Sequence, residues 1–202
     1  GKSTLANELA PLINAEILST DKIREELYKD ETIQGNWNEI ESLLHERLKE
    51  YIRQNKPVIL DATFAMRPWR LTITQNLLFD KEIEWIGWWF KTPLEICLEW
   101  NQLRERKVDD PVIKRFAAAL SNKIFSPDLS EGFATLINID PSSTEDITKE
   151  IKSRLSNLDR NITQRKNKDS IKELHGYSKL LDFERLLYPV SYTHLTLPTI
   201  SR

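Results

Sequence analysis

The chain has 202 residues, of which 40% are hydrophobic and 30% are charged. This balance excludes an intrinsically disordered chain and indicates a globular protein of one domain, or one domain and a fragment. The net charge of −2 provides no global attraction to nucleic acid or to an anionic membrane, although a local basic patch is compatible with it. Cys97 is the only cysteine, so an internal disulfide is excluded, which fits a reducing cytoplasmic location without a membrane partner.

Helical and strand-like patterns alternate along residues 1–156. A continuous apolar run over 57–62 is typical of a strand buried on both faces of a parallel sheet, and the aromatic and β-branched residues of 83–90 favour another strand. The alternation predicts an α/β fold of three layers, a parallel sheet with helices on both faces. In chain order, the expected elements are a helix over 3–13, a strand over 15–19, helices over 21–29 and 37–54, a strand over 57–62, a helix over 68–79, a strand over 83–90, helices over 93–106 and 110–123, a strand over 135–139 and a helix over 144–155.

The composition changes beyond residue 156. Residues 157–169 contain few apolar side chains and are expected to form a linker, and residues 170–189 return to helical periodicity. Residues 190–202 resemble the peptide that translated sequencing-adaptor DNA encodes, so they are excluded from the fold argument. The alternative is a genuine tail of similar sequence.

The first four residues match the end of the phosphate-binding motif G-x-x-x-x-G-K-[ST]. In such a loop, the backbone of Gly1 to Thr4 and the following helix N-terminus would face phosphate oxygens. Lys2 would reach the β- and γ-phosphates of ATP, and the Ser3 hydroxyl would bind Mg²⁺. The alternative is an ordinary helix start in which Ser3 or Thr4 is an N-cap.

Asp61 ends the apolar run Val-Ile-Leu-Asp, the pattern of a carboxylate that holds Mg²⁺ beside a phosphate loop. The alternative is an aspartate that stabilises the turn after a strand. A phosphate-loop motif followed by such a strand, within an alternating α/β pattern, is more specific than either motif alone.

Asp21 and Arg24 follow the strand expected over 15–19. Residues beyond the carboxyl ends of parallel strands face the ligand crevice. Asp21 could accept the proton of an attacking hydroxyl, and Arg24, three residues later on one helix face, could hold an acceptor phosphate. The alternative is that Thr20 or Asp21 caps the helix.

Arg104 and Arg106 lie late in the helix expected over 93–106, where a mobile lid could bring them to the transferring phosphoryl group or to adenine. On a helix the two would be roughly 200° apart, so they share one role only if the helix ends between them. The alternative is a solvated helix face. Asp110 and Pro111 are expected to be the N-cap and first residue of the next helix.

The remaining aromatic and histidine residues favour ordinary structural roles. Trp85, Trp88 and Trp89 suit packing of a strand against helices better than stacking on nucleic-acid bases, because no basic residues are interleaved with them. The histidines are far apart without metal-ligand spacing, so no protein metal site is expected apart from the Mg²⁺ that would accompany ATP.

Together, these residues resemble the polynucleotide-kinase-like branch of P-loop kinases, which includes zeta-toxin-like proteins, and bacterial proteins described as AAA-family ATPases. The resemblance covers roughly residues 1–140. It rests on GKST, STDKIR and VILDAT, and on TPLEICLEWNQLRER before VDDPVIKRF. One departure is Phe64, which replaces the asparagine of the family's D-A-T-N and leaves the acceptor open.

The resemblance implies Lys2 and Ser3 at ATP and Mg²⁺, Asp21 as base, Arg24 toward the substrate, and Arg104 or Arg106 in a lid. The expected function is transfer of the γ-phosphoryl group of ATP to a hydroxyl acceptor, such as a nucleic-acid end or a nucleoside. An ATP-gated module that controls a missing C-terminal region is the alternative, and a nucleic-acid-binding protein that uses its tryptophans is a weaker one. Residues 170–189 resemble the start of a further helical region, cut off here.

The central strand that precedes a phosphate loop is expected to be missing from this chain. Such a strand buries about five apolar side chains, each of which stabilises a fold by about 1.5–3 kcal/mol. The loss is as large as the stability of a whole domain, about 5–15 kcal/mol. We therefore expect that the 202-residue chain alone neither folds stably nor binds ATP.

Overall fold

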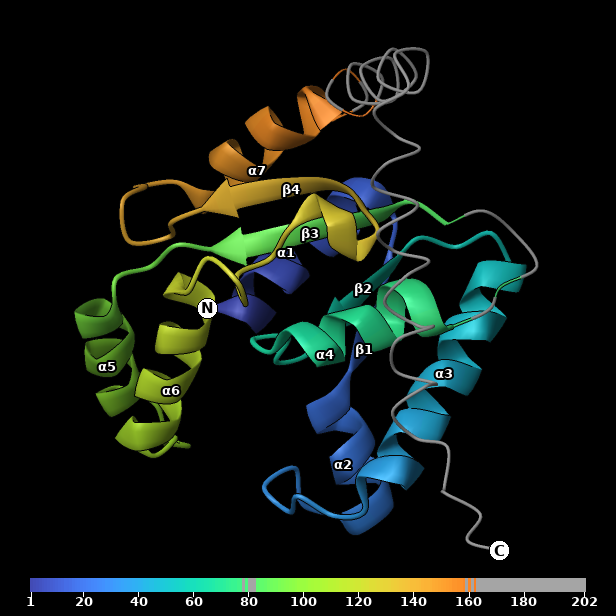
Figure 1. The fold of residues 1–202 in the computed structure, drawn as a ribbon, viewed down its shortest axis with the longest axis horizontal. Helices are drawn as coiled ribbons and strands as arrows, with labels where there is room; N and C mark the ends of the chain where they lie inside the picture. The colour runs from blue at the N-terminus through green and yellow to red at the C-terminus, as the bar shows by residue number, and fades with distance from the viewer. Residues whose placement is uncertain (78, 80–82, 159, 161, 163–202) are drawn as a thin grey trace, which may run out of the picture. The chain divides into compact units, whose positions relative to one another are not determined.

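Parallel strand pairs form the centre of the unit Gly1–Ser156 in a computed structural model (Figure 1). The structure describes residues 1–77, 79, 83–158, 160 and 162. The expected helical region 170–189 and the tail 190–202 lie outside the described residues, as does most of the expected linker. The strands are β1 (Glu16–Ser19), β2 (Val58–Asp61), β3 (Trp85–Phe90) and β4 (Phe133–Ile139). The helices are α1 (Lys2–Ile13), α2 (Thr20–Tyr28), α3 (Trp37–Arg53), α4 (Arg67–Leu71), α5 (Leu94–Gln102), α6 (Asp110–Ser121) and α7 (Ile147–Ser156), with a π-helical turn at Thr72–Asn76 and a 3₁₀ turn at Leu129–Glu131.

The strands pair in parallel as expected, but in two separate pairs. β1 pairs with β2, and β3 pairs with β4, so the described residues form two two-stranded sheets; the prediction was a parallel sheet that lacks its central strand. Every residue of β2 and β3 is only half-buried. The run 57–62 is therefore only partly buried, although its two faces pack against different apolar clusters; within the described residues, each of these strands has one paired neighbour.

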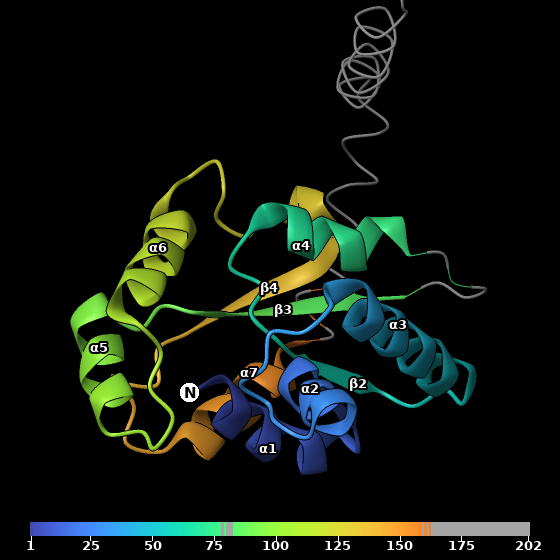
Figure 2. The same cartoon turned by 90° about the horizontal axis from the view of Figure 1, so that it is seen from below.

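One face of the strands packs against α1 and α7. Leu5 and Leu9 of α1 and Ile151 of α7 form a buried cluster with Ile139 of β4. Partly buried residues of both strand pairs join this cluster: Ile59 of β2, and Trp88 and Phe90 of β3. α1 therefore packs against both pairs, and Figure 2 shows α1 and α7 on one side of β3 and β4 with α4 on the other.

The opposite face carries a second core. Ile40, Leu44 and Leu48 recur every four residues along α3, so they lie on one face of this helix and are buried. They cluster with Leu18 of β1 and Ile23 of α2. Partly buried side chains that pack against this second core are Val58 and Leu60 of β2, Phe64 and Trp85. Alternate residues of β2 thus enter different cores, which gives the expected helices on both faces of the strands.

Several element boundaries differ from the sequence predictions. The helix expected over 68–79 is a short α4 followed by a π-helical turn, and it ends at residue 76. α5 ends at Gln102, four residues before the predicted end. Asp109, not Asp110, is the N-cap residue of α6, and Pro111 is the second helical residue.

Candidate functional site

The carboxyl ends of β1 and β2 place the predicted acidic residues together. Ser19 pairs directly with Asp61 in the parallel register, and α2 begins at the next residue, Thr20. Asp21 therefore follows β1 at the same edge of the sheet at which Asp61 ends β2. This is the edge at which parallel α/β sheets bind ligands.

The first residues of the chain lie beside this edge. Gly1, Lys2, Ser3 and Thr4 are all exposed at the start of α1. The Gly1 amino group donates a hydrogen bond to Thr4 Oγ1 at 3.0 Å. Gly1 is the N-cap residue of α1, so Ser3 and Thr4 lie within the first turn and neither caps the helix.

Electrostatics and packing identify the neighbours of Gly1. The charges of Arg104, Lys2 and Asp61 all act on the Gly1 nitrogen, so these side chains lie near it. Arg104 Nη2 lies 3.0 Å from the position that a Cβ atom on Gly1 would occupy. Gly1, Asp61 and Arg104 are therefore close in space, although they come from three distant parts of the sequence.

Charged side chains gather around Asp21: Glu31 and Arg106 are partly exposed, whereas the Arg24 side chain is only 12% exposed. Arg24 Nη1 donates to Asp21 Oδ1 at 2.7 Å, while the Asp21 side chain remains 51% exposed. The guanidinium of Arg106 lies 3.7 Å from the other Asp21 oxygen and 3.0 Å from Glu31. Neither Thr20 nor Asp21 caps α2, because Ser19 is the N-cap residue and no side chain makes a capping hydrogen bond.

Arg104 and Arg106 both lie in the turn after α5, so the expectation that they belong to a helix is wrong. The turn allows the two side chains to diverge. Arg104 approaches Gly1, and Arg106 reaches Asp21 and Glu31. In Figure 1, α5 and α6 stand apart from the strands, beside the N-terminus of the chain.

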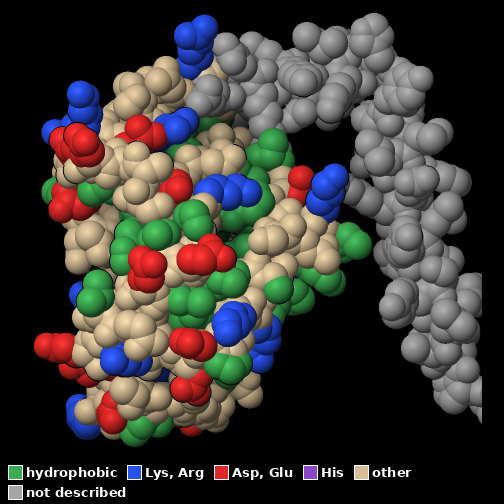
Figure 3. Space-filling model, turned by 90° about the vertical axis from the view of Figure 1, so that its left-hand side faces the viewer, with side chains coloured by type: hydrophobic (Ala, Val, Ile, Leu, Met, Phe, Trp, Pro, Cys, Tyr) green, Lys and Arg blue, Asp and Glu red, His purple; other side chains and the backbone are tan. Residues whose placement is uncertain are grey.

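Glu31 is a residue of this cluster that sequence reasoning missed. It lies between α2 and α3 in a stretch without regular structure. Its only sequence signal is a carboxylate ten residues after Asp21, and surface loops carry many such residues. The face that carries α5 and α6 shows acidic, basic and apolar side chains interspersed (Figure 3).

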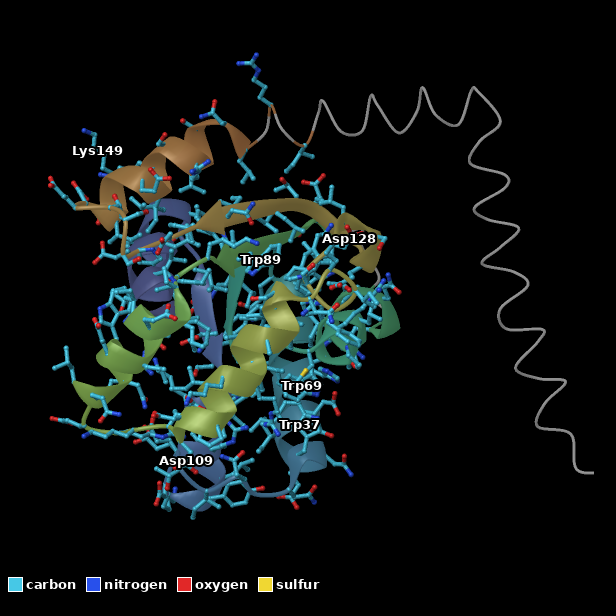
Figure 4. All side chains as sticks on the ribbon, turned by 60° about the vertical axis from the view of Figure 1, so that its left-hand side comes forward. Trp37, Trp69, Trp89, Asp109, Asp128 and Lys149 are labelled. Carbon is cyan, nitrogen blue, oxygen red and sulfur yellow. The ribbon has the colours of Figure 1, made fainter. Side chains whose placement is uncertain are left out.

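Phe64, the departure from the family motif, belongs to the second core. Its ring is half-buried and packs against that cluster, and its carbonyl oxygen accepts a hydrogen bond from Arg70 Nη1 at 3.0 Å. Trp69 of α4, labelled in Figure 4, is 41% exposed. Its ring meets that of Phe116 of α6 edge-on, with 6.0 Å between ring centroids.

The described residues also limit other kinds of site. Within them, no three His, Cys, Asp or Glu side chains gather closely enough to hold a metal ion. A Mg²⁺ ion at Ser3 and Asp61 would therefore depend on further oxygen ligands, such as nucleotide phosphates. No helix in the described ranges combines the length and apolarity needed to cross a membrane.

Comparison with known families identifies one match. The model of a family described as an AAA domain matches residues 1–122, which run from the phosphate-loop motif through α6. A comparison with curated proteins gives no match. The family match covers more than half of the chain and includes Lys2, Asp61 and the turn after α5. The chain therefore belongs to the AAA-domain family of P-loop nucleotide-binding proteins.

Proposed function

We propose that the protein from which this chain derives, called the parent protein below, is a cytoplasmic ATP-dependent kinase of the polynucleotide-kinase-like and zeta-toxin-like branch. It transfers the γ-phosphoryl group to a hydroxyl of a nucleic-acid end, a nucleoside or a related acceptor. The observation that carries the proposal is the turn after α5, which brings Arg104 to Gly1 and Arg106 to Asp21. One segment thus contacts both the phosphate-loop motif and the acidic residue suited to a base.

The residues at the start of α1 fit a nucleotide phosphate chain. Lys2 and the amide groups of the exposed first turn would hold its oxygens, and the Ser3 hydroxyl and the Asp61 carboxylate would hold Mg²⁺. Bound Mg²⁺ would neutralise charge on the phosphates. Arg104, close to Gly1, would stabilise the charge of the transferring group.

Asp21 is the proposed general base. Its carboxylate is half exposed, and Arg24 fixes one oxygen at 2.7 Å while the other faces Arg106 at 3.7 Å. An acceptor hydroxyl beside Asp21 would pass its proton to this carboxylate as it attacks. Arg24 would orient Asp21 and contact a phosphate on the acceptor.

The parent protein is also proposed to supply a strand between β2 and β3. α1 packs against Ile59 of β2 and against Trp88 and Phe90 of β3, so it spans the two strand pairs. A parallel strand immediately before Gly1 would lie beneath α1 and join the pairs into one sheet. As a separate proposal, residues 1–156 form the ATP-binding domain, 157–169 a linker, 170–189 the start of a helical region and 190–202 an adaptor-derived tail.

The strand proposal is tested by thermal unfolding of the 202-residue chain and of the parent protein. The parent protein should unfold cooperatively, with a midpoint that rises with ATP and Mg²⁺. The 202-residue chain should show neither property. A cooperative, nucleotide-dependent transition of the shorter chain would contradict the proposed strand.

The kinase proposal is tested by incubating the parent protein with γ-labelled ATP, Mg²⁺ and a panel of hydroxyl acceptors. Asp21→Asn should lower transfer by about 10²- to 10⁴-fold, the usual contribution of a general base. Glu25→Gln is the matched control, because Glu25 is an exposed acid on the same helix. Equal transfer by Asp21→Asn and wild type would contradict the base assignment. ATP binding with little turnover and no transfer to any acceptor would favour the ATP-gated module instead.

A further inference from the structure

Asn101 is a buried polar side chain at the end of α5, with 3% of its surface exposed. Its Nδ2 atom donates a hydrogen bond to the carbonyl oxygen of Val108 at 2.7 Å, and its Oδ1 atom accepts one from the Val108 amide at 3.0 Å. The side chain therefore binds both backbone groups of a single residue, as a neighbouring strand would.

These two hydrogen bonds close the turn formed by residues 103–107. The Arg104 amide also donates to the backbone oxygen of Asn101 at 3.3 Å, and the Leu103 side chain is 85% exposed. Little apolar burial holds Leu103 in place, so the turn depends on the hydrogen bonds of Asn101. The turn carries Arg104 and Arg106, whose side chains point to different partners.

We propose that Asn101 is a positioning residue that holds the turn so that Arg104 serves the nucleotide phosphates and Arg106 serves the acceptor side at Asp21. This inference rests on the proposed function. The two hydrogen bonds described for the Asn101 side chain go to Val108 and not to either arginine. Asn101 acts through the backbone of Val108, and this contact fixes the position of the residue at which the turn ends, just before α6.

The chemistry of the side chain explains why asparagine is suited to this position. The amide offers a donor and an acceptor side by side, matching the backbone of Val108. In Asn101→Asp, a carboxylate would still accept from the Val108 amide but would face its carbonyl oxygen without a donor. In Asn101→Leu, both backbone groups of Val108 would lose their partner.

A double-mutant cycle in the parent protein tests the proposal. Asn101→Asp should lower phosphoryl transfer at least about tenfold, since small displacements of catalytic groups lower rates by up to about 10²-fold. In a background of Arg104→Ala with Arg106→Ala, the same substitution should lower the residual rate less than about twofold. An equal loss in both backgrounds would show a general structural role and overturn the proposal.

Asn122→Asp is the matched control. Asn122 follows α6, and its Oδ1 atom accepts a hydrogen bond from the Ile124 amide at 2.8 Å, but it lies outside the turn that carries the arginines. Its effect on transfer should be small and the same in both backgrounds. A loss as large and as background-dependent as that of Asn101→Asp would also overturn the proposal.

Two further readouts separate failure of this inference from failure of the proposed function. In Asn101→Leu, hydrogen exchange of the Val108 amide should become at least about tenfold faster, which requires no catalysis. Asn101→Asp should also weaken ATP binding in wild type but not in Arg104→Ala. If the parent protein transfers no phosphate yet shows both effects, the kinase assignment fails and the positioning role stands. Unchanged Val108 exchange in Asn101→Leu would overturn the positioning role.

Discussion

Two clusters of charged residues in the unit Gly1–Ser156 differ in burial and in bonding. Arg70 and Glu131 are 3% and 0% exposed, and their side chains make a double contact at 2.6 and 2.8 Å. In contrast, Asp21, Glu31 and Arg106 form an exposed cluster at the edge of β1 and β2, with side chains 51%, 47% and 37% exposed, and the mostly buried Arg24 pairs with Asp21 beside them.

The bonding of Arg70 shows what the buried cluster does. Besides Glu131, its guanidinium donates to the carbonyl oxygens of Phe64 at 3.0 Å, Ala65 at 3.2 Å and Phe125 at 2.6 Å. It therefore joins the segment after β2 to the segments that follow α6. The exposed cluster is also linked by ion pairs, but Asp21, Glu31 and Arg106 face water, so these charges can exchange partners when a ligand arrives. The two clusters thus differ in role: the buried charges of Arg70 and Glu131 stabilise the fold, and the exposed charges near Asp21 remain accessible to a ligand.

The largest expected effect comes from breaking the buried cluster on one side. Arg70→Met would leave the Glu131 carboxylate buried without its main partner, so we expect the free energy of unfolding of the parent protein to fall by about 3–5 kcal/mol. Denaturant unfolding measures this change. A loss below about 1 kcal/mol would mean that the network is not the structural anchor described above.

The double variant Arg70→Met with Glu131→Leu sharpens the same comparison. Because both charges are removed together, no unpaired ion remains in the interior, and apolar replacements of buried pairs are often neutral or stabilising. We expect it to be more stable than Arg70→Met alone. If the two variants are equally unstable, the carbonyl contacts of Arg70 matter more than the ion pair.

The exposed cluster should show the opposite behaviour. Glu31→Gln should change the free energy of unfolding by less than about 1 kcal/mol, as is usual for exposed ion pairs. It should raise KM for the acceptor severalfold, because Arg106 would then pair more closely with Asp21. The control is Glu26→Gln. Glu26 lies on α2, and this substitution removes its exposed ion pair with Arg47 of α3. It should leave KM unchanged, and an equal change in both variants would contradict a role for Glu31 at the site.

The smallest expected effect concerns His45, a half-buried residue on α3. Burial lowers the pKa of its imidazole, Lys49 lowers it further, and Glu41 opposes them. The unfolded chain therefore binds a proton more readily than the folded one, so stability falls as pH drops below about 6.5, the ordinary histidine pKa. The loss is complete below the folded pKa. His45→Gln should flatten this part of the stability profile, and an unchanged profile would contradict the assignment.

The sequence predicts the local features well. The apolar spacing along α3 and the apolar run at β2 each lie within one short, continuous stretch of sequence. The structure confirms both elements. The buried pair has no such signal, because Arg70 and Glu131 are 61 residues apart and each resembles a solvated surface charge. Similarly, helical periodicity continues past Gln102, but α5 ends there, and the buried Asn101 side chain bonds to the backbone of Val108.

The candidate site was predictable in composition but not in arrangement. Lys2, Asp21 and Asp61 follow from motifs and from the rule that parallel strands place their carboxyl ends together. Which arginine faces which partner depends on the path of the turn after α5, and sequence spacing does not determine that path. The roles of these residues stay predictions until they are tested in the parent protein.

The most direct test of the central claim is titration of the parent protein with ATP and Mg²⁺, compared with its Lys2→Ala variant. Lys2 is exposed, so the variant should unfold at the same midpoint as wild type without nucleotide. Its ATP affinity should be weaker by at least about tenfold, corresponding to about 1.4 kcal/mol. Equal ATP affinity of the two proteins would contradict a phosphate-binding role for the start of α1.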